Sequence, residues 1–137
     1  MPTWNSSLAV GVPVIDRQHQ ELFARTDALL TAMKTGKSGQ EVGELLRFLE
    51  AYCVEHFATE AKLMRRIAYP ATAQHLALHE HFTSEFAKIK ETFAQKGASA
   101  TVTLSIQSLF CSWLVKHIGS VDKALAAHVT STKAEAV

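Results

Sequence analysis

A histidine and a glutamate stand four residues apart in the stretch HFATE, as His56 and Glu60. Four residues are about one helical turn, so both side chains project from the same face of a helix. The surrounding segment, LLRFLEAYCVEHFATEAKLM, has apolar residues at helical spacing, and both positions fall where a core-facing leucine is expected. Imidazole and carboxylate groups are ligands of first-row divalent metal ions. The stretch is therefore a candidate metal-binding pair inside a helical protein.

Three further segments carry the same residue types within apolar stripes of helical spacing. In antiparallel helices joined by short loops, positions equally distant from a turn lie at the same height along the axis. Counted from loop centres near residues 37, 68 and 98, His79 and His117 are matched in height, as are Glu60 and His75. The set of candidate metal ligands at this one level is His19, His56, Glu60, His75, His79, His117 and Asp122.

The spacing of His117 and Asp122 in HIGSVD does not suit a regular α-helix. Five residues correspond to a rotation of about 140° between the two side chains. Both can face the interior only if the helix bulges or ends there, and Gly119 makes such an irregularity less costly. The sequence therefore predicts a local departure from α-helical geometry between these two residues.

Seven polar side chains at one buried level need a compensating charge. Seven ligands exceed the four that zinc takes, and they suit two metal ions with bridging carboxylates and terminal histidines. Neither His-Glu-x-x-His nor Glu-x-x-His occurs, which excludes zincin and carboxylate-rich di-iron patterns, and there is no glycine-rich phosphate loop. The pattern leaves out His81 and His128, which are interpreted as structural residues.

Turn-forming residues divide the chain into the helices that must position these ligands. Turn signals near 34–39, 67–71 and 95–100 separate helices predicted at 16–34, 40–66, 70–95 and 101–124, with Asp16 as the N-cap of the first. The 137 residues suit a single domain, consisting of an N-terminal arm at 1–15, a bundle at 16–124 and a C-terminal tail at 125–137. The expected fold is all-α, an antiparallel up-down four-helix bundle with an extended N-terminal arm anchored by Trp4.

Composition excludes several classes of protein. Lysine and arginine number 14 against 13 acidic residues, a net charge of +1, so binding to nucleic acid or an anionic membrane surface is not expected. No apolar run reaches the ~20 residues of a membrane span, and the first residues lack the pattern of a signal peptide, which predicts a cytoplasmic protein. The two cysteines, Cys53 and Cys111, are expected to be reduced and buried in helices.

With these motifs assembled, the sequence resembles the hemerythrin family, specifically its bacterial branch. The family pattern is one histidine on the first helix, H-x3-E on the second, H-x3-H on the third and H-x4-D on the fourth. Here IDRQH, HFATE, HLALH and HIGSVD fill all seven positions, and WNSSLAVGVPVID and WLVKHI also look like that branch. One departure is Ala61, where relatives often carry a second glutamate that is not a ligand.

The resemblance implies a non-haem di-iron centre that binds dioxygen reversibly. One iron would be held by three histidines and the other by His19 and His56, with Glu60, Asp122 and an oxo or hydroxo group as bridges. Dioxygen would bind at the two-histidine iron, in a dry pocket formed by Leu114, Ile118 and Trp113.

The expected function is oxygen storage, transport or supply by a monomeric protein that is not an enzyme. Its client protein is not indicated by the sequence. Three alternatives stay open: an oxygen or redox sensing domain, peroxide or nitric oxide chemistry at the two irons, and iron storage.

Overall fold

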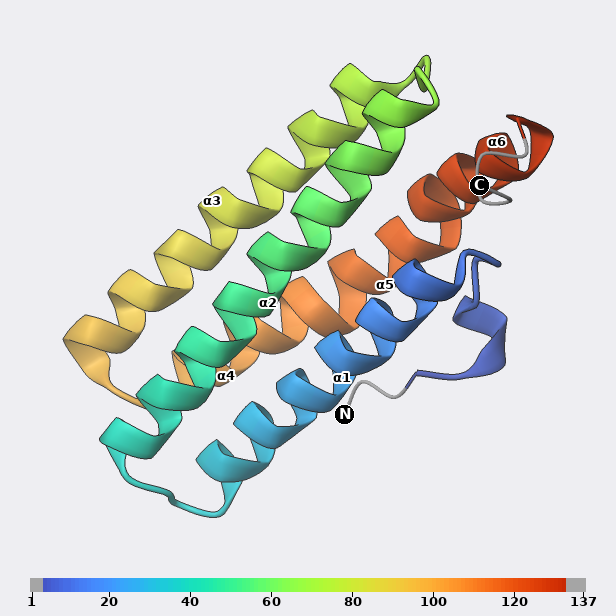
Figure 1. Cartoon of the computed structure of the whole chain (residues 1–137). Helices are drawn as coiled ribbons and strands as arrows, with labels where there is room; N and C mark the ends of the chain where they lie inside the picture. The colour runs from blue at the N-terminus through green and yellow to red at the C-terminus, as the bar shows by residue number, and fades with distance from the viewer. Residues whose placement is uncertain (1–3, 133–137) are drawn as a thin grey trace.

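The computed structural model describes residues 4–132, and in this range it forms four antiparallel helical rods (Figure 1). The first three rods are α1 (Pro13–Lys34), α2 (Gly39–Arg66) and α3 (Thr72–Lys96). The fourth rod is continuous but changes its helical type along its length, from α4 (Ala100–Ile106) through η2 (Gln107–Trp113), α5 (Leu114–His117) and η3 (Ile118–Asp122) to α6 (Lys123–Thr132). The predicted up-down four-helix bundle is therefore confirmed.

Side-chain caps explain where two of the rods begin. The hydroxyl group of Ser38 accepts a hydrogen bond from the backbone N–H of Glu41, and that of Ser99 accepts one from Val102. Each cap satisfies a backbone donor that has no partner within the first helical turn. The short loops that result place each rod beside its neighbour, which is what brings distant ligand types to one level.

The first helix begins at Pro13, three residues earlier than predicted, and Asp16 is not its N-cap. Val12 holds the N-cap position, and proline suits the first turn because its missing N–H would have no helical partner there. The carboxylate of Asp16 instead accepts backbone N–H groups of Val10, at 2.8 Å, and Gly11, at 3.2 Å. Asp16 therefore holds the arm against the first turn of the helix.

The described part of the N-terminal arm includes one 3-10 turn, η1 (Ser6–Leu8), and packs along the bundle (Figure 1). Trp4 is partly buried against the core, so its predicted role as an anchor is confirmed. Residues 1–3 of the predicted arm and 133–137 of the predicted tail lie outside the described residues.

The fourth rod continues to Thr132, so the prediction that a tail begins at residue 125 was wrong. Leu125, Ala126 and Val129 keep the helical spacing of apolar residues and are buried. Cys53 and Cys111 are both free, but only Cys53 is buried, while Cys111 is half-buried. None of the helices in residues 4–132 combines the length and hydropathy needed to cross a lipid bilayer.

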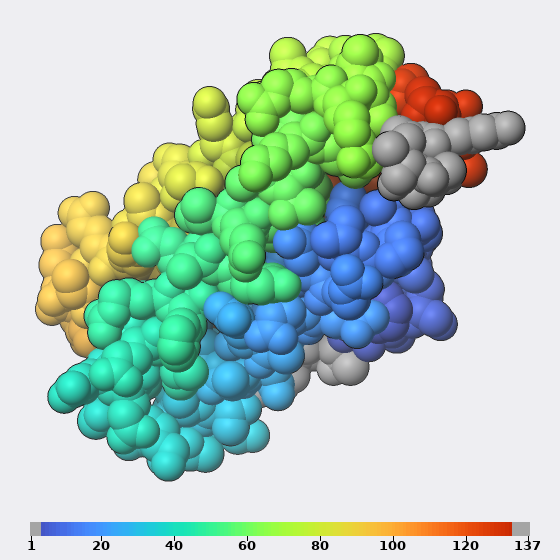
Figure 2. Space-filling model, viewed as in Figure 1, coloured from blue at the N-terminus to red at the C-terminus, as the bar shows by residue number. Residues whose placement is uncertain are grey.

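Two apolar clusters fill the interior and leave a polar layer between them. The larger cluster includes Leu22, Cys53, Phe82 and Leu114, and the smaller one lies near the opposite end of the bundle. The smaller cluster consists of Val12, Ile15, Leu63, Met64, Leu125, Ala126 and Val129. In Figure 2 the side chains of α1 and α2 meet along their length on the face shown. On this face the layer between the clusters is covered by these two helices.

Candidate metal centre

The seven predicted ligands come together in this polar layer. Each of the four rods contributes, through α1, α2, α3 and the α5–η3 part of the fourth rod. All are almost fully buried, with exposed fractions from 0 to 5%: His19, His56, Glu60, His75, His79, His117 and Asp122. Their ligand atoms form two overlapping groups that could each hold a metal ion, within which these atoms lie no more than 4.8 Å apart.

The first group contains the three histidines of the third and fourth rods. Oε1 of Glu60 lies 2.9 Å from Nε2 of His75 and 3.1 Å from Nε2 of His79. Oδ1 of Asp122 lies 3.2 Å from Nε2 of both His75 and His117. The regular four-residue spacing on α2 and α3 places these side chains on facing helical surfaces.

The second group contains the two histidines of α1 and α2. Nε2 of His56 lies 3.1 Å from Oε2 of Glu60, and Nε2 of His19 lies 3.1 Å from Oδ2 of Asp122. Each carboxylate therefore directs one oxygen to the three-histidine group and the other oxygen to the two-histidine group. This division suits carboxylates that bridge two ions.

The awkward spacing of His117 and Asp122 is resolved by η3, a π-helical turn over Ile118–Asp122. A π-turn pairs residues five apart, so both side chains can face the interior. The predicted irregularity is thus confirmed. A second π-helical segment, η2, was not predicted, because Leu109, Phe110 and Trp113 have the spacing of an ordinary α-helix.

Electrostatics keeps both carboxylates ionised inside the bundle. Burial alone would raise the pKa of Glu60, but the neighbouring imidazoles of His56, His75 and His79 hold that pKa well below its usual value. Burial and the charge of Glu60 would also raise the pKa of Asp122, and the neighbouring imidazoles again lower it. The layer therefore presents two anionic groups to whatever occupies it.

The histidines respond to the same environment in different ways. Burial would lower the pKa of His75, yet the adjacent carboxylates of Asp122 and Glu60 raise it to about 9. For His79, burial prevails and lowers the pKa. Without a metal ion, His75 therefore protonates more readily than His79 and can balance part of the charge of the carboxylates.

Unpaired atoms and distances both fit bound cations. Within residues 4–132 these buried site atoms have no hydrogen-bond partner: both ring nitrogens of His19, His79 and His117, Nδ1 of His75, Oε2 of Glu60 and both oxygens of Asp122. Two ligands placed about 2.1 Å from one ion and at right angles to each other are ~3.0 Å apart. The observed nitrogen–oxygen distances of 2.9 to 3.2 Å match that value. The donor set therefore fits two metal ions.

The predicted pocket residues lie close to this layer. Leu114 and Ile118 are buried and belong to the larger apolar cluster. The indole ring of Trp113 is stacked on His117, with ring centroids 4.9 Å apart and an interplanar angle of 13°. His81 and His128 do not join the two ligand groups found among the described residues.

Two residues that contact the ligands were missed by sequence reasoning. The ring of Phe57 is stacked on His79, with centroids 3.9 Å apart, and Gln18 contacts His56 through its side-chain oxygen at 2.7 Å. Each stands directly beside a ligand in the sequence, and so falls one position off the apolar stripe. Their position next to a ligand was the only feature of the sequence that could have indicated this role.

Comparisons with known proteins agree with this geometry. Residues 10–129 match the family model described as the hemerythrin HHE cation binding domain. The bacteriohemerythrin of Stenotrophomonas maltophilia (strain R551-3) is 31% identical over 126 residues, covering 92% of this chain and 80% of the relative. That of Methylococcus capsulatus (strain ATCC 33009 / NCIMB 11132 / Bath) is 30% identical over 122 residues, covering 88% and 91%. A crystal structure of a leucine-to-tyrosine hemerythrin mutant superimposes with a TM-score of 0.81 at 27% identity, covering 94% of this chain and 97% of the other.

Proposed function

The chain belongs to the hemerythrin family, and we propose that it binds dioxygen reversibly at a non-haem di-iron centre within the buried polar layer. The observation that carries this proposal is the division of the cluster into a three-histidine half and a two-histidine half that share both carboxylates. Two redox-active ions in one site can together exchange two electrons with a bound molecule. Redox-inactive ions such as zinc cannot exchange any.

The proposed ligand assignment follows the two halves. One iron would be held by His75, His79 and His117, and the other by His19 and His56, with Glu60, Asp122 and an oxo or hydroxo group as bridges. The two-histidine half has fewer protein ligands, so we assign the open coordination position for dioxygen to that iron.

The residues around the site would keep water away from it. Leu114 and Ile118 are 1% and 0% exposed and offer only apolar surface, and we assign both to the dioxygen pocket. Trp113 stacks on His117 and is assigned to the wall of the same pocket. Exclusion of water and anions slows irreversible oxidation, so such a pocket favours reversible binding over turnover.

We therefore propose a carrier used for oxygen storage, transport or supply, and not an enzyme. The proposal includes a monomer that acts in the cytoplasm, which sedimentation and cell fractionation would test.

The experiment that tests the proposal is a visible spectrum of the iron-loaded protein. The protein is reduced without air, exposed to dioxygen and then purged with an inert gas. A coloured adduct that forms on exposure and disappears on purging supports a carrier. Direct conversion to a stable ferric form refutes reversible binding and favours redox sensing or peroxide chemistry.

A further inference from the structure

Gln18 is a buried amide that connects α1 to the site on α2. Its side chain is 9% exposed and lies one residue before His19. Its oxygen Oε1 is 2.7 Å from Nδ1 of His56, and its nitrogen Nε2 donates to Oγ1 of Thr59 at 3.0 Å. The amide is thus held at both ends by residues of the neighbouring helix.

The direction of these hydrogen bonds is set by the backbone. Oγ1 of Thr59 donates its single proton to the carbonyl oxygen of Glu55, at 3.0 Å, so towards Gln18 it can only accept. The amide nitrogen of Gln18 must then face Thr59, which leaves the amide oxygen facing His56. An amide oxygen only accepts, so Nδ1 of His56 must carry the proton.

This proton position has a consequence at the centre of the site. With the proton on Nδ1, a neutral His56 keeps its lone pair on Nε2, the nitrogen that lies 3.1 Å from Oε2 of Glu60. The lone pair is therefore available to a metal ion without any change of tautomer.

His56 differs in this respect from the other four histidines of the cluster. Their Nδ1 atoms are buried and have no hydrogen-bond partner among residues 4–132: His19, His75, His79 and His117. The one histidine with an oriented outer nitrogen belongs to the two-histidine half.

We propose that Gln18 is a positioning residue that locks His56 in the Nδ1–H tautomer and strengthens Nε2 as a ligand of the two-histidine half. A hydrogen bond accepted from the outer ring nitrogen makes the inner nitrogen more basic and restricts rotation of the ring. This inference rests on the proposed metal site and adds a residue that acts on only one of its two halves.

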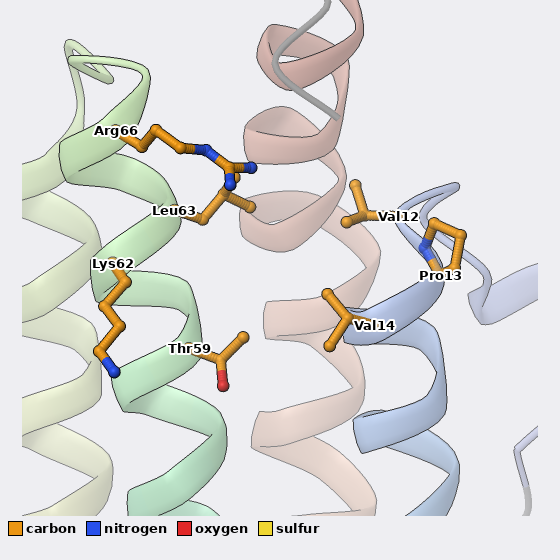
Figure 3. A pocket seen from close by; sticks show the side chains of 7 residues that line it. All are labelled: Val12, Pro13, Val14, Thr59, Lys62, Leu63 and Arg66. Atoms are coloured by element: carbon orange, nitrogen blue, oxygen red, sulfur yellow. The ribbon is translucent and has the colours of Figure 1, made fainter. Parts of the chain in front are cut away.

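The outer end of this chain of hydrogen bonds reaches the surface. Figure 3 shows Thr59 on α2 with its side chain towards the gap between that helix and the start of α1. It lines a cavity of about 380 Å³ together with Val12, Pro13, Val14, Lys62, Leu63 and Arg66. Water in the cavity can replace part of the role of Thr59, whereas Gln18 is too buried for such replacement. Thr59→Val is therefore expected to have a smaller effect than Gln18→Met.

The test uses the full chain loaded with zinc, which is diamagnetic and binds the same ligand types. Gln18→Met keeps the side-chain length but loses the amide acceptor, and Gln20→Met makes the same exchange at an exposed position of the same helix. Gln18→Glu restores an acceptor for His56. Competition with a chelator measures the affinity of each zinc equivalent, and proton–nitrogen NMR of the imidazoles reports the proton on Nδ1 of His56.

We expect Gln18→Met to weaken one of two zinc equivalents about 10- to 100-fold and to lose the slowly exchanging Nδ1–H signal of His56. Gln20→Met should match the wild type, and Gln18→Glu should recover both the affinity and the signal. Wild-type affinities and an unchanged His56 signal in Gln18→Met would overturn this inference alone. Failure of the wild-type chain to bind two zinc ions would refute the metal site itself, and this inference with it.

Discussion

Glu60→Ala tests the central assignment, because this carboxylate faces both halves of the site. Glu60 is 0% exposed, with Oε1 at 2.9 Å from His75 and Oε2 at 3.1 Å from His56. Removing it takes one ligand from each proposed ion and also removes one of the two negative charges that attract them. We therefore expect both ions to be lost, and not one.

The size of the effect can be estimated from zinc sites with four ligands. Their apparent binding free energies of ~10–16 kcal/mol correspond to about 3 kcal/mol for each ligand, or roughly 100-fold in affinity for each ion. After desalting in the presence of a mild chelator, Glu60→Ala should retain well below two iron ions per chain, as measured by elemental analysis. The wild type should retain two.

Two further variants separate loss of ligation from loss of folding. Glu60→Gln keeps the side-chain volume but removes the charge, so it should fold and still bind iron weakly. Glu44→Ala removes an exposed glutamate from the same helix and should bind iron as the wild type does. Full occupancy by two iron ions in Glu60→Ala would refute the bridging assignment.

Three other predictions follow from the same geometry. Leu114→Ala should retain both metal ions, lose about 3 kcal/mol of stability and autoxidise faster; an unchanged autoxidation rate would remove Leu114 from the pocket. Removal of metal by a chelator should lower the melting temperature, because an ion present at 1,000 times its Kd stabilises the folded state by about 4 kcal/mol. The pKa of His75, raised to about 9 by Asp122 and Glu60 despite burial, predicts stabilisation of the metal-free fold that is complete below pH 6.5 and lost as pH rises through about 9. The urea midpoints of the metal-free wild type and of metal-free His75→Gln should therefore approach each other as the pH rises from 6.5 through about 9. A difference between the midpoints that stays constant with pH would contradict the charge assigned to His75.

The helical spacing of residues determined which side chains share a face. His56 and Glu60, like His75 and His79, are one turn apart, so an α-helix brings each pair together whatever surrounds it. Short loops between long helices then determined the antiparallel order and the height of each pair. These features are local in the chain, and for that reason the bundle and the membership of the cluster could be predicted from the sequence.

The helix ends and the partners of individual atoms could not be predicted in this way. Asp16 resembled an N-cap, but its carboxylate holds the arm, because the helix could start earlier at Pro13. The fourth rod continued past residue 124 because Leu125 and Val129 found an apolar cluster to pack against. Such outcomes depend on contacts that the local pattern does not contain.

The sequence by itself determined the residue types, their helical faces and their common level in the bundle. Only the tertiary structure decided how each carboxylate divides its oxygens between the two halves, that the second π-helical segment, η2, occurs in the fourth rod, and that Gln18 orients His56. The physical reason is that the two kinds of feature depend on interactions between different parts of the chain. Periodicity is set by neighbours along one helix, whereas hydrogen bonds and metal ligation depend on distances of about 3 Å between atoms on different helices.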